Sequence, residues 1–148
     1  MMNRVVCVND ARRQLIDYIV SDAVFRGDFT LSSGLKASFY VDLRRVSLDH
    51  RVAPLIGSVM LDLIADVPDV AAVGGMTMGA DPIAAAILHQ GAATGRSYDA
   101  FVVRKEPKDH GTGRRIEGNF KPGDAVVVVE DVITSGGSAR NALEAVEE

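Results

Sequence analysis

The segment Val126–Ser138, VVVVEDVITSGGS, limits the possible folds of this 148-residue chain more than any other feature. Its four consecutive valines predict a strand buried on both faces, and hence one that is parallel and central in its sheet. Two acids, Glu130 and Asp131, follow directly, and small residues then lead into a helical pattern from about Ala139. The segment therefore predicts a strand, a loop and a helix of an α/β fold.

The residue types of this segment suit a sugar phosphate. Open α/β sheets bind ligands at the carboxyl ends of their strands, where the two acids stand and where carboxylates can accept hydrogen bonds from ribose hydroxyls. The loop Thr134–Ser138 can surround a phosphate at a helix N-terminus, where the helix dipole favours an anion. A buried strand followed by an ordinary turn is one alternative. A Walker-B strand is another, but the chain contains no Gly-Lys-Ser or Gly-Lys-Thr.

Composition excludes several classes of protein. The length fits one domain with a core of its own, so we expect residues 1–148 to form a single domain. No apolar stretch reaches the roughly 18 residues of a membrane span, and we recognise no secretory signal. Cys7 stands alone, which excludes a disulfide framework. A net charge of −4 argues against nucleic acid as a partner. We therefore expect a cytoplasmic protein without a membrane or nucleic-acid partner.

Basic residues gather within a short stretch of this acidic chain. They are Arg104, Lys105, Lys108, Arg114 and Arg115, with His110 among them. Such a cluster predicts a local anion site. Residues 104–119 lack periodicity and contain glycine, so we expect a long loop, a feature that is often a functional lid. A solvated basic loop is the alternative, and His50 and His89 are expected to be structural.

Apolar periodicity and turn residues predict the remaining elements. We expect helices at about residues 10–24, 49–64 and 82–89, and strands at 29–31, 38–41, 70–73 and 100–103. Gly74–Gly79 is expected to form a turn between a strand and a helix. The first helix should bury one face, which consists of Leu15, Ile16, Ile19, Val20 and Ala23. Strands that alternate with helices predict a parallel sheet with right-handed crossovers.

The segment at 126–138 resembles the phosphoribosyl-diphosphate (PRPP) signature of the type I phosphoribosyltransferases. Three more segments narrow the resemblance: FTLSSGLKASFYVDLR at 29–44, GGMTMGADPIAAAI at 74–87 and VVRKEPKDHGTGRRIEG at 102–118. Together they resemble the orotate phosphoribosyltransferases, from about Phe25 to Ala145. The resemblance implies an α/β fold with a parallel sheet flanked by helices, and an N-terminal helix and small hood within residues 1–45.

The resemblance also implies an activity. Members of this family are glycosyltransferases (pentosyltransferases) that transfer the phosphoribosyl group of PRPP to orotate, with Mg²⁺ as the cofactor. The products are orotidine 5′-monophosphate and pyrophosphate, in the synthesis of UMP. The family forms homodimers with shared active sites. A transferase for another base, a PRPP-binding regulatory module and an inactive fragment remain as alternatives.

Site residues follow from the same resemblance. The catalytic residues would be Lys105, Lys108, His110 and Asp131. PRPP would be bound by Arg104, Lys105, Lys108, His110, Glu130, Asp131, Val132, Ile133, Thr134, Ser135, Gly136, Gly137 and Ser138. Orotate would be bound by Thr134, Lys36, Phe39 and Tyr40, in a segment that includes Ser33 and Gly34. The range Gly74–Gly79 matches the pyrophosphate loop. We expect no direct metal ligand, because Mg²⁺ would be held mainly through PRPP. A place in the core is the alternative for Phe39 and Tyr40.

Three departures from the family pattern stand out. Many members carry lysine where this chain has Ser32 and Gly79. Two cations are therefore missing, and Arg44, Arg45 or Arg114 are the candidates to compensate for them. The family's arginine for the orotate carboxylate lies beyond the last helix, so we expect a chain shortened at its C-terminus.

Overall fold

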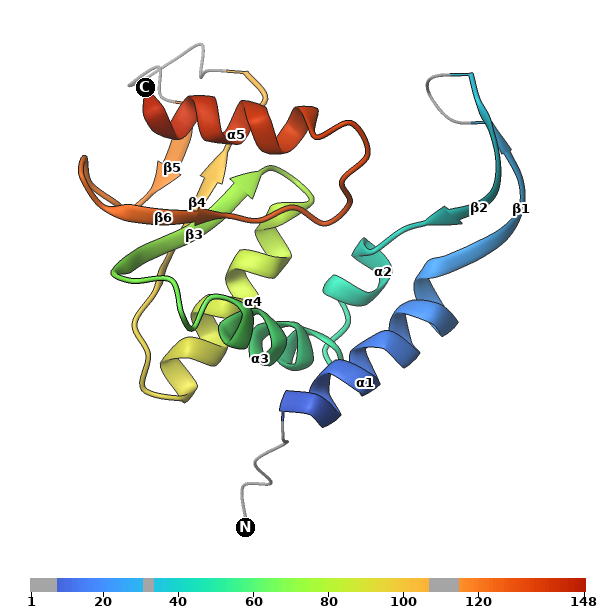
Figure 1. Cartoon of the computed structure of the whole chain (residues 1–148), viewed down its shortest axis with the longest axis horizontal. Coiled ribbons are helices and arrows are strands. Elements are labelled where there is room, and N and C mark those ends of the chain that lie inside the picture. The colour runs from blue at the N-terminus through green and yellow to red at the C-terminus, as the bar shows by residue number, and fades with distance from the viewer. Residues whose placement is uncertain (1–7, 31–33, 107–114) are drawn as a thin grey trace.

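The computed structural model describes residues 8–30, 34–106 and 115–148. Figure 1 shows a sheet that lies between layers of helices, with a hairpin standing off one end. The helices are α1 (Val8–Tyr18), α2 (Arg44–Ser47), α3 (Ala53–Leu63), α4 (Ala80–Ala93) and α5 (Gly137–Glu147), with a π-helical turn η1 (Ile19–Ala23). The strands are β1 (Val24–Thr30), β2 (Lys36–Val41), β3 (Val70–Met76), β4 (Asp99–Val103), β5 (Ile116–Gly118) and β6 (Ala125–Val128).

The main sheet has the strand order β5-β4-β3-β6. Strand β3 is parallel to both β4 and β6, so the predicted parallel arrangement is confirmed for these three strands. The predicted central position of the valine strand is wrong, because β6 lies at the edge of the described sheet and β3 takes an inner position. Among the residues that the structure describes, β6 is paired along one edge, and Val126–Val128 are half-buried.

The structure differs from the predicted long loop at strand β5. Residues 116–118 were predicted to belong to a long loop, but they pair antiparallel with β4, with Ile116 opposite Val103. The sheet is therefore mixed. A strand of three residues gives no readable alternation of apolar and polar side chains, and its pairing depends on a partner distant in sequence. The rest of the expected loop, residues 107–114, lies outside the described residues.

The predicted turn directly after residue 73 is wrong at its first two glycines. Gly74 and Gly75 lie inside β3, so the strand continues to Met76. A Cβ atom at Gly74 would meet the carbonyl oxygen and ring of Phe101, and one at Gly75 would meet the carbonyl oxygen of Val129. These glycines serve close packing rather than a turn, because any side chain would collide with neighbouring backbone.

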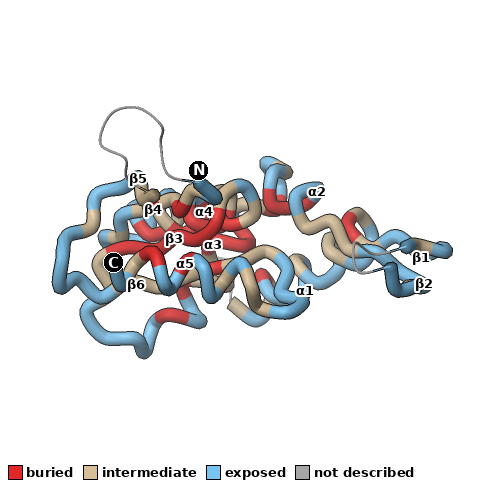
Figure 2. Tube along the Cα trace, turned by 90° about the horizontal axis from the view of Figure 1, so that it is seen from above, coloured by how far each residue is buried: buried red, intermediate tan, exposed pale blue. Residues whose placement is uncertain are grey.

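Helices cover both faces of the sheet and form two apolar clusters. On one face, α3 and α4 pack against Val73 and Val129 in a cluster that also includes Ile56 and Ile87. On the other face, α5 packs against Phe101 and its neighbours through small alanines. Figure 2 shows that the buried residues gather in this body and become sparse in the hairpin. None of the helices in the described part of the chain is long and apolar enough to cross a membrane.

The first helix buries a narrower face than its sequence predicts. Ala23 is fully buried, and Leu15 and Ile19 pack partly against the core. Ile16 and Val20 instead remain 51% and 61% exposed. Helix α1 packs mainly against α3, and one neighbouring helix covers only one stripe of its surface.

Strands β1 and β2 form the antiparallel hairpin that we call the hood. The register pairs Val24 with Val41 and Thr30 with Lys36. The predicted helix to residue 24 ends in η1, and β1 starts five residues before the predicted strand at 29–31. The hood is confirmed as a small N-terminal hairpin (Figure 1).

Candidate active site

Three adjacent parallel strands end at one edge of the sheet and create the candidate site. The segment Thr77–Gly79 directly follows β3, and Arg104 directly follows β4. The acids Glu130 and Asp131 follow β6 after one intervening residue. The N–H of Thr77 donates to the carbonyl oxygen of Val103 at 2.9 Å, which ties the first of these segments to the second. Because ligands bind at the carboxyl ends of parallel strands, the topology brings these segments together as a binding edge.

The loop after β6 has the form expected of a phosphate cradle. A cavity of about 50 Å³ is lined by the loop from Val132 to Ala139 and by Glu130. Gly136 has a φ of +77°, in the left-handed region that favours glycine, and α5 begins directly after it. The loop therefore presents backbone N–H groups and hydroxyls at a helix N-terminus, where an anion is stabilised. The predicted residues Thr134 and Ser138 both line this cavity.

The two acids differ in their surroundings. Oε2 of Glu130 is buried and has no hydrogen-bond partner among the described residues. Burial raises the pKa of the Glu130 carboxyl, and a hydrogen bond and repulsion from Asp131 raise it further. Asp131 accepts a hydrogen bond at Oδ1 from the N–H of Val132, at 2.9 Å. The pair thus offers one fixed acceptor and one unpartnered oxygen, as ribose hydroxyls require.

Gly79 lies directly against Asp131. A Cβ atom at position 79 would stand 2.7 Å from Cγ of Asp131, and closer still to Oδ1. In this structure the carboxylate occupies the space in which a side chain at position 79 would begin.

One polar pair in the site was not predicted. The hydroxyl of Thr77 donates to Oδ2 of Asp81, in the first turn of α4, at 2.7 Å. Oδ1 of Asp81 is buried without a partner among the described residues. The pair fixes the segment between β3 and α4. An acid directly before a predicted helix, four residues after a threonine, was the signal in the sequence.

The predicted basic residues are only partly described. Arg104 is half-buried, its N–H donates to the carbonyl oxygen of Arg115 at 2.8 Å, and its Nε is buried without a partner in the described part of the chain. Lys105 is exposed beside it. Lys108 and His110 lie outside the described residues. The structure therefore places one cation firmly at the end of β4, and the catalytic roles of Lys105, Lys108, His110 and Asp131 stay predictions.

The hood residues predicted to bind orotate do not share one face. Neighbouring residues of a strand point to opposite faces, so Phe39 and Tyr40 lie on opposite sides of β2. They are 56% and 42% exposed, which excludes a place in the core. Lys36 is on the same face as Tyr40, and its Nζ donates to Oγ1 of Thr30 at 2.8 Å. Gly34 is exposed with a φ of +83°, and Ser33 lies outside the described residues.

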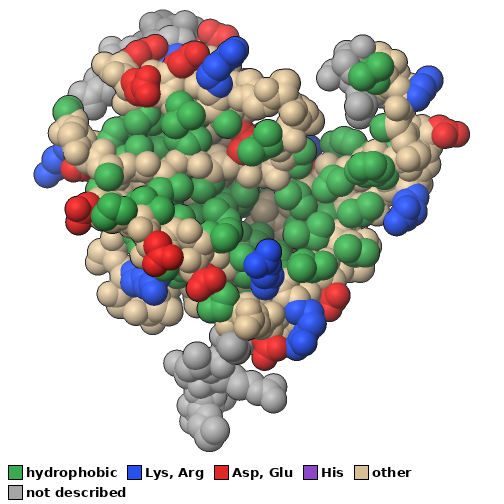
Figure 3. All heavy atoms as spheres, in the orientation of Figure 1, with side chains coloured by type: hydrophobic (Ala, Val, Ile, Leu, Met, Phe, Trp, Pro, Cys, Tyr) green, Lys and Arg blue, Asp and Glu red, His purple; other side chains and the backbone are tan. Residues whose placement is uncertain are grey.

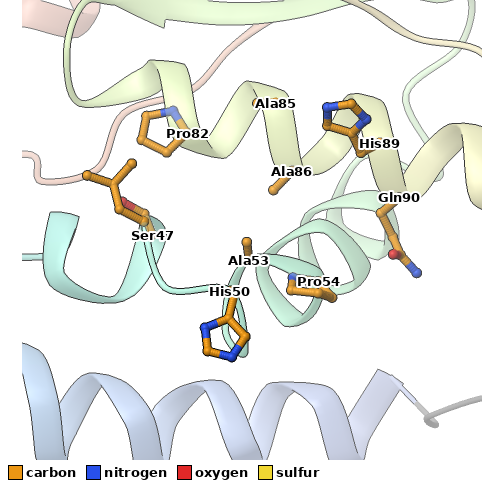
Figure 4. A pocket seen from close by; sticks show the side chains of 10 residues that line it. Ser47, His50, Ala53, Pro54, Pro82, Ala85, Ala86, His89 and Gln90 are labelled. Carbon is orange, nitrogen blue, oxygen red and sulfur yellow. The ribbon is translucent and has the colours of Figure 1, made fainter.

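A separate apolar pocket of about 380 Å³ lies between α4 and the segment that joins α2 to α3 (Figure 4). His50 and His89 line it, together with Pro54, Pro82 and Ala85. Both histidines are exposed, and their expected structural role stays a prediction. The pocket contains none of the predicted site residues.

No group of three or more His, Cys, Asp or Glu side chains suited to a metal ion occurs within residues 8–30, 34–106 and 115–148. The pair Glu130 and Asp131 nevertheless fits a hydrated Mg²⁺, because that ion uses one or two carboxylates and takes its other ligands from phosphates and water. The unpartnered Oε2 of Glu130 is the structural observation that agrees with this chemistry.

A mostly parallel sheet with a hood, and a Glu-Asp pair that leads into a glycine-containing loop at a helix N-terminus, are the features of the type I phosphoribosyltransferases. No sequence model of a protein family matches the chain. Individual proteins do match it. The orotate phosphoribosyltransferase of Tropheryma whipplei (strain Twist) is 59% identical over 137 residues, which are 93% of this chain and 64% of that protein. That of Streptomyces avermitilis is 57% identical over 141 residues, 95% of this chain and 77% of that protein.

Solved structures agree with these relatives. The crystal structure of Mycobacterium tuberculosis H37Rv orotate phosphoribosyltransferase in complex with Fe(III) dicitrate has a TM-score of 0.81 and 50% identity, covering 93% of this chain and 76% of that one. A complex of the same protein with PRPP has a TM-score of 0.72 and 41% identity, and the match covers 93% of this chain and 68% of that one. The chain belongs to the orotate phosphoribosyltransferase family. It spans 64% of the length of the Tropheryma relative.

Proposed function

We propose that the chain is an orotate phosphoribosyltransferase, which transfers the phosphoribosyl group of PRPP to orotate in pyrimidine (UMP) synthesis. The observation that carries the proposal is the binding edge, where the Glu130–Asp131 pair and the phosphate cradle follow one strand and Arg104 follows another. Family membership supports it, as does the PRPP complex of the Mycobacterium tuberculosis relative.

The reaction needs no nucleophile from the protein. A ring nitrogen of orotate forms a bond to C1 of the ribose, while the bond from C1 to the diphosphate oxygen breaks and that oxygen keeps the electron pair. Glu130 and Asp131 hold the ribose hydroxyls, and Thr134–Ser138 hold the 5′-phosphate. Arg104 and Lys105, with Lys108 and His110, stabilise the charge that develops on the leaving pyrophosphate.

Magnesium belongs to the proposal as the cofactor. When bound, Mg²⁺ supplies positive charge that neutralises the diphosphate. It would be held mainly by oxygens of PRPP and by water, with Glu130 and Asp131 as the nearest carboxylates of the chain.

The proposal also includes a cytoplasmic homodimer with shared active sites. The single cysteine and the absence of a long apolar stretch in the sequence support the location. Exposed apolar side chains support an interface with a second copy. Figure 3 shows them over α1 and the hood, where Ile16, Val20 and Phe39 are at least half exposed. Sedimentation equilibrium checks the dimer, and a monomer at micromolar concentration would contradict it.

The first experiment is to follow orotate consumption by the 148-residue chain with PRPP and Mg²⁺. Lys105→Ala is the test variant, because Lys105 is exposed and its loss should spare the fold. Lys121→Ala is the matched control, because Lys121 is exposed and precedes β6, at the opposite end of that strand from the two acids. Adenine, hypoxanthine and uracil replace orotate in parallel reactions.

Orotate-specific turnover that Lys105→Ala lowers at least tenfold, and that Lys121→Ala leaves unchanged, supports the proposal. Turnover with another base would identify a different transferase. PRPP binding by calorimetry without turnover of any base would favour a regulatory module, and absence of PRPP binding would reject the class.

A further inference from the structure

The described part of the site contains few cations for two anionic substrates, one with a diphosphate and the other with a carboxylate. Glu130 and Asp131 already contribute negative charge at the binding edge, and position 79 carries no side chain. Arg104 follows β4, on the far side of Thr77–Gly79 from the acids. A further cation on the side of the hood would balance this arrangement. Arg44 and Arg45 lie there, at the start of α2.

Arg45 is held away from the site. Its Nε donates to the carbonyl oxygen of Asp22 at 2.9 Å, which joins α2 to η1. Its guanidinium carbon also lies 5.3 Å from the centre of the Phe25 ring, in a cation–π contact. Both contacts stabilise the base of the hood, so Arg45 has a structural role. Arg114 lies outside the described residues.

Arg44 is held differently. Its Nε donates to Oδ1 of Asp42 at 3.1 Å, and among the described residues the hydrogen bonds of its side chain involve Nε alone. The side chain is 47% exposed, so its two terminal nitrogens remain available to a ligand. Asp42 therefore fixes the direction of the guanidinium without occupying its outer edge, which is the edge that binds phosphate or carboxylate groups in a bidentate manner.

The position of Arg44 connects the hood to the binding edge. Helix α2 follows β2 and packs against α4, whose first residue comes directly after Gly79. The hydrogen bond and charge of Asp42 raise the pKa of the Arg44 guanidinium, and the nearby Tyr40 and Asp131 raise it further. Arg44 thus lies within electrostatic range of both a predicted orotate residue and a predicted ribose residue.

We propose that Arg44 is a substrate-binding residue of this site, and that its guanidinium binds the diphosphate of PRPP. This inference rests on the proposed function. The other oxyanion that the same fork fits is the carboxylate of orotate. The diphosphate is favoured because it carries more charge and is bonded to the ribose that Asp131 is predicted to hold.

Calorimetric titration with PRPP, pyrophosphate and orotate, each with Mg²⁺, tests the assignment on wild type, Arg44→Gln, Arg44→Lys and Arg45→Gln. Arg44→Gln should weaken PRPP and pyrophosphate binding at least tenfold and leave orotate binding within twofold. Arg44→Lys should recover only part of the loss, because an ammonium lacks the planar fork. Arg45→Gln should lower the melting temperature and leave PRPP binding within twofold.

Each other outcome is decisive. PRPP binding by Arg44→Gln that equals wild type overturns the role of Arg44 and leaves the proposed function intact. A loss confined to orotate overturns the assignment to the diphosphate. Equal losses in Arg44→Gln and Arg45→Gln, with equal losses in melting temperature, reduce both residues to structural support. Failure of the wild type to bind PRPP or pyrophosphate rejects the proposed function, and the inference falls with it.

Discussion

Replacement of Gly79 by alanine should weaken PRPP binding without destabilising the protein. Gly79 has φ −74° and ψ −41°, a conformation that alanine adopts freely, so the effect comes from the added Cβ alone. That atom would stand 2.7 Å from Cγ and 3.0 Å from Oδ2 of Asp131. Ordinary contacts are about 3.5 Å, so the carboxylate must move by roughly 1 Å.

The magnitude follows from what this movement breaks. Asp131 loses its hydrogen bond from the N–H of Val132, worth about 1 kcal/mol. Holding the carboxylate in place instead requires a strained rotamer, at about 1 kcal/mol. If PRPP needs the carboxylate where it now lies, binding weakens by the cost of that strained rotamer, about 1 kcal/mol, or roughly fivefold. In the free protein the carboxylate can turn toward water, and the hydrogen bond that it then loses is offset by the roughly 0.4–1 kcal/mol that alanine contributes through the unfolded chain.

Calorimetry with PRPP and Mg²⁺, together with urea denaturation, measures both quantities. A double-mutant cycle with Asp131→Ala isolates the contact, because Gly79→Ala should change little once the carboxylate is absent. Wild-type affinity in Gly79→Ala would refute the reasoning. An equal loss with and without Asp131 would show that the methyl group acts through something other than this carboxylate.

Three further predictions concern the same edge and its support. Because burial raises the pKa of Glu130, the free energy of unfolding should fall as the pH rises from the ordinary pKa of glutamate through the raised pKa of the folded state. Above this pH range, Glu130→Gln should have a higher melting temperature than wild type. A difference in melting temperature that persists in acid would contradict this explanation. Thr77→Val should lower the free energy of unfolding, measured by urea denaturation, by about 1–3 kcal/mol, because Asp81 loses the hydroxyl that donates to it. A change below about 0.5 kcal/mol would show that water replaces the hydroxyl. Phe101→Ala should lower the free energy of unfolding by about 3–5 kcal/mol in the same assay, because Phe101 is 1% exposed and packs edge-on against Phe120 with 5.1 Å between the ring centres. A smaller loss would mean that neighbouring side chains move in to fill the cavity.

Local patterns were enough to predict much of this fold. The parallel pairing of the valine strand, the loop that leads from it into α5 and the hood hairpin follow from runs of apolar residues and from glycine-rich turns. The edge position of β6 did not follow, because it depends on which other strands pair with it. Gly74 and Gly75 were assigned to a turn for a similar reason. Glycine favours turns locally, whereas its use here is set by Phe101 and Val129, which are distant in sequence.

In the site, too, features within one segment could be predicted, whereas contacts between distant segments could not. The Glu130–Asp131 pair could be found in the sequence because its chemistry is concentrated in one segment. The contact of Gly79 with Asp131 could not, since it joins residues on two different strand ends. Three arginines were equivalent candidates in the sequence. The structure separates Arg45 from Arg44 through contacts with Asp22 and Phe25, which no local pattern encodes.

The glycines of β3 have a consequence for how this site can change in evolution. Where β3 approaches the binding edge, Gly74 and Gly75 contribute main-chain atoms alone to the floor of the sheet. Main-chain groups held in a sheet have no rotamers to lose, so the strand beneath the binding edge keeps its shape whatever side chains follow it. Because almost no other residue fits at these two positions, we expect sequence change near this edge to occur in the segments that follow the strands and in the exposed residues of the hood.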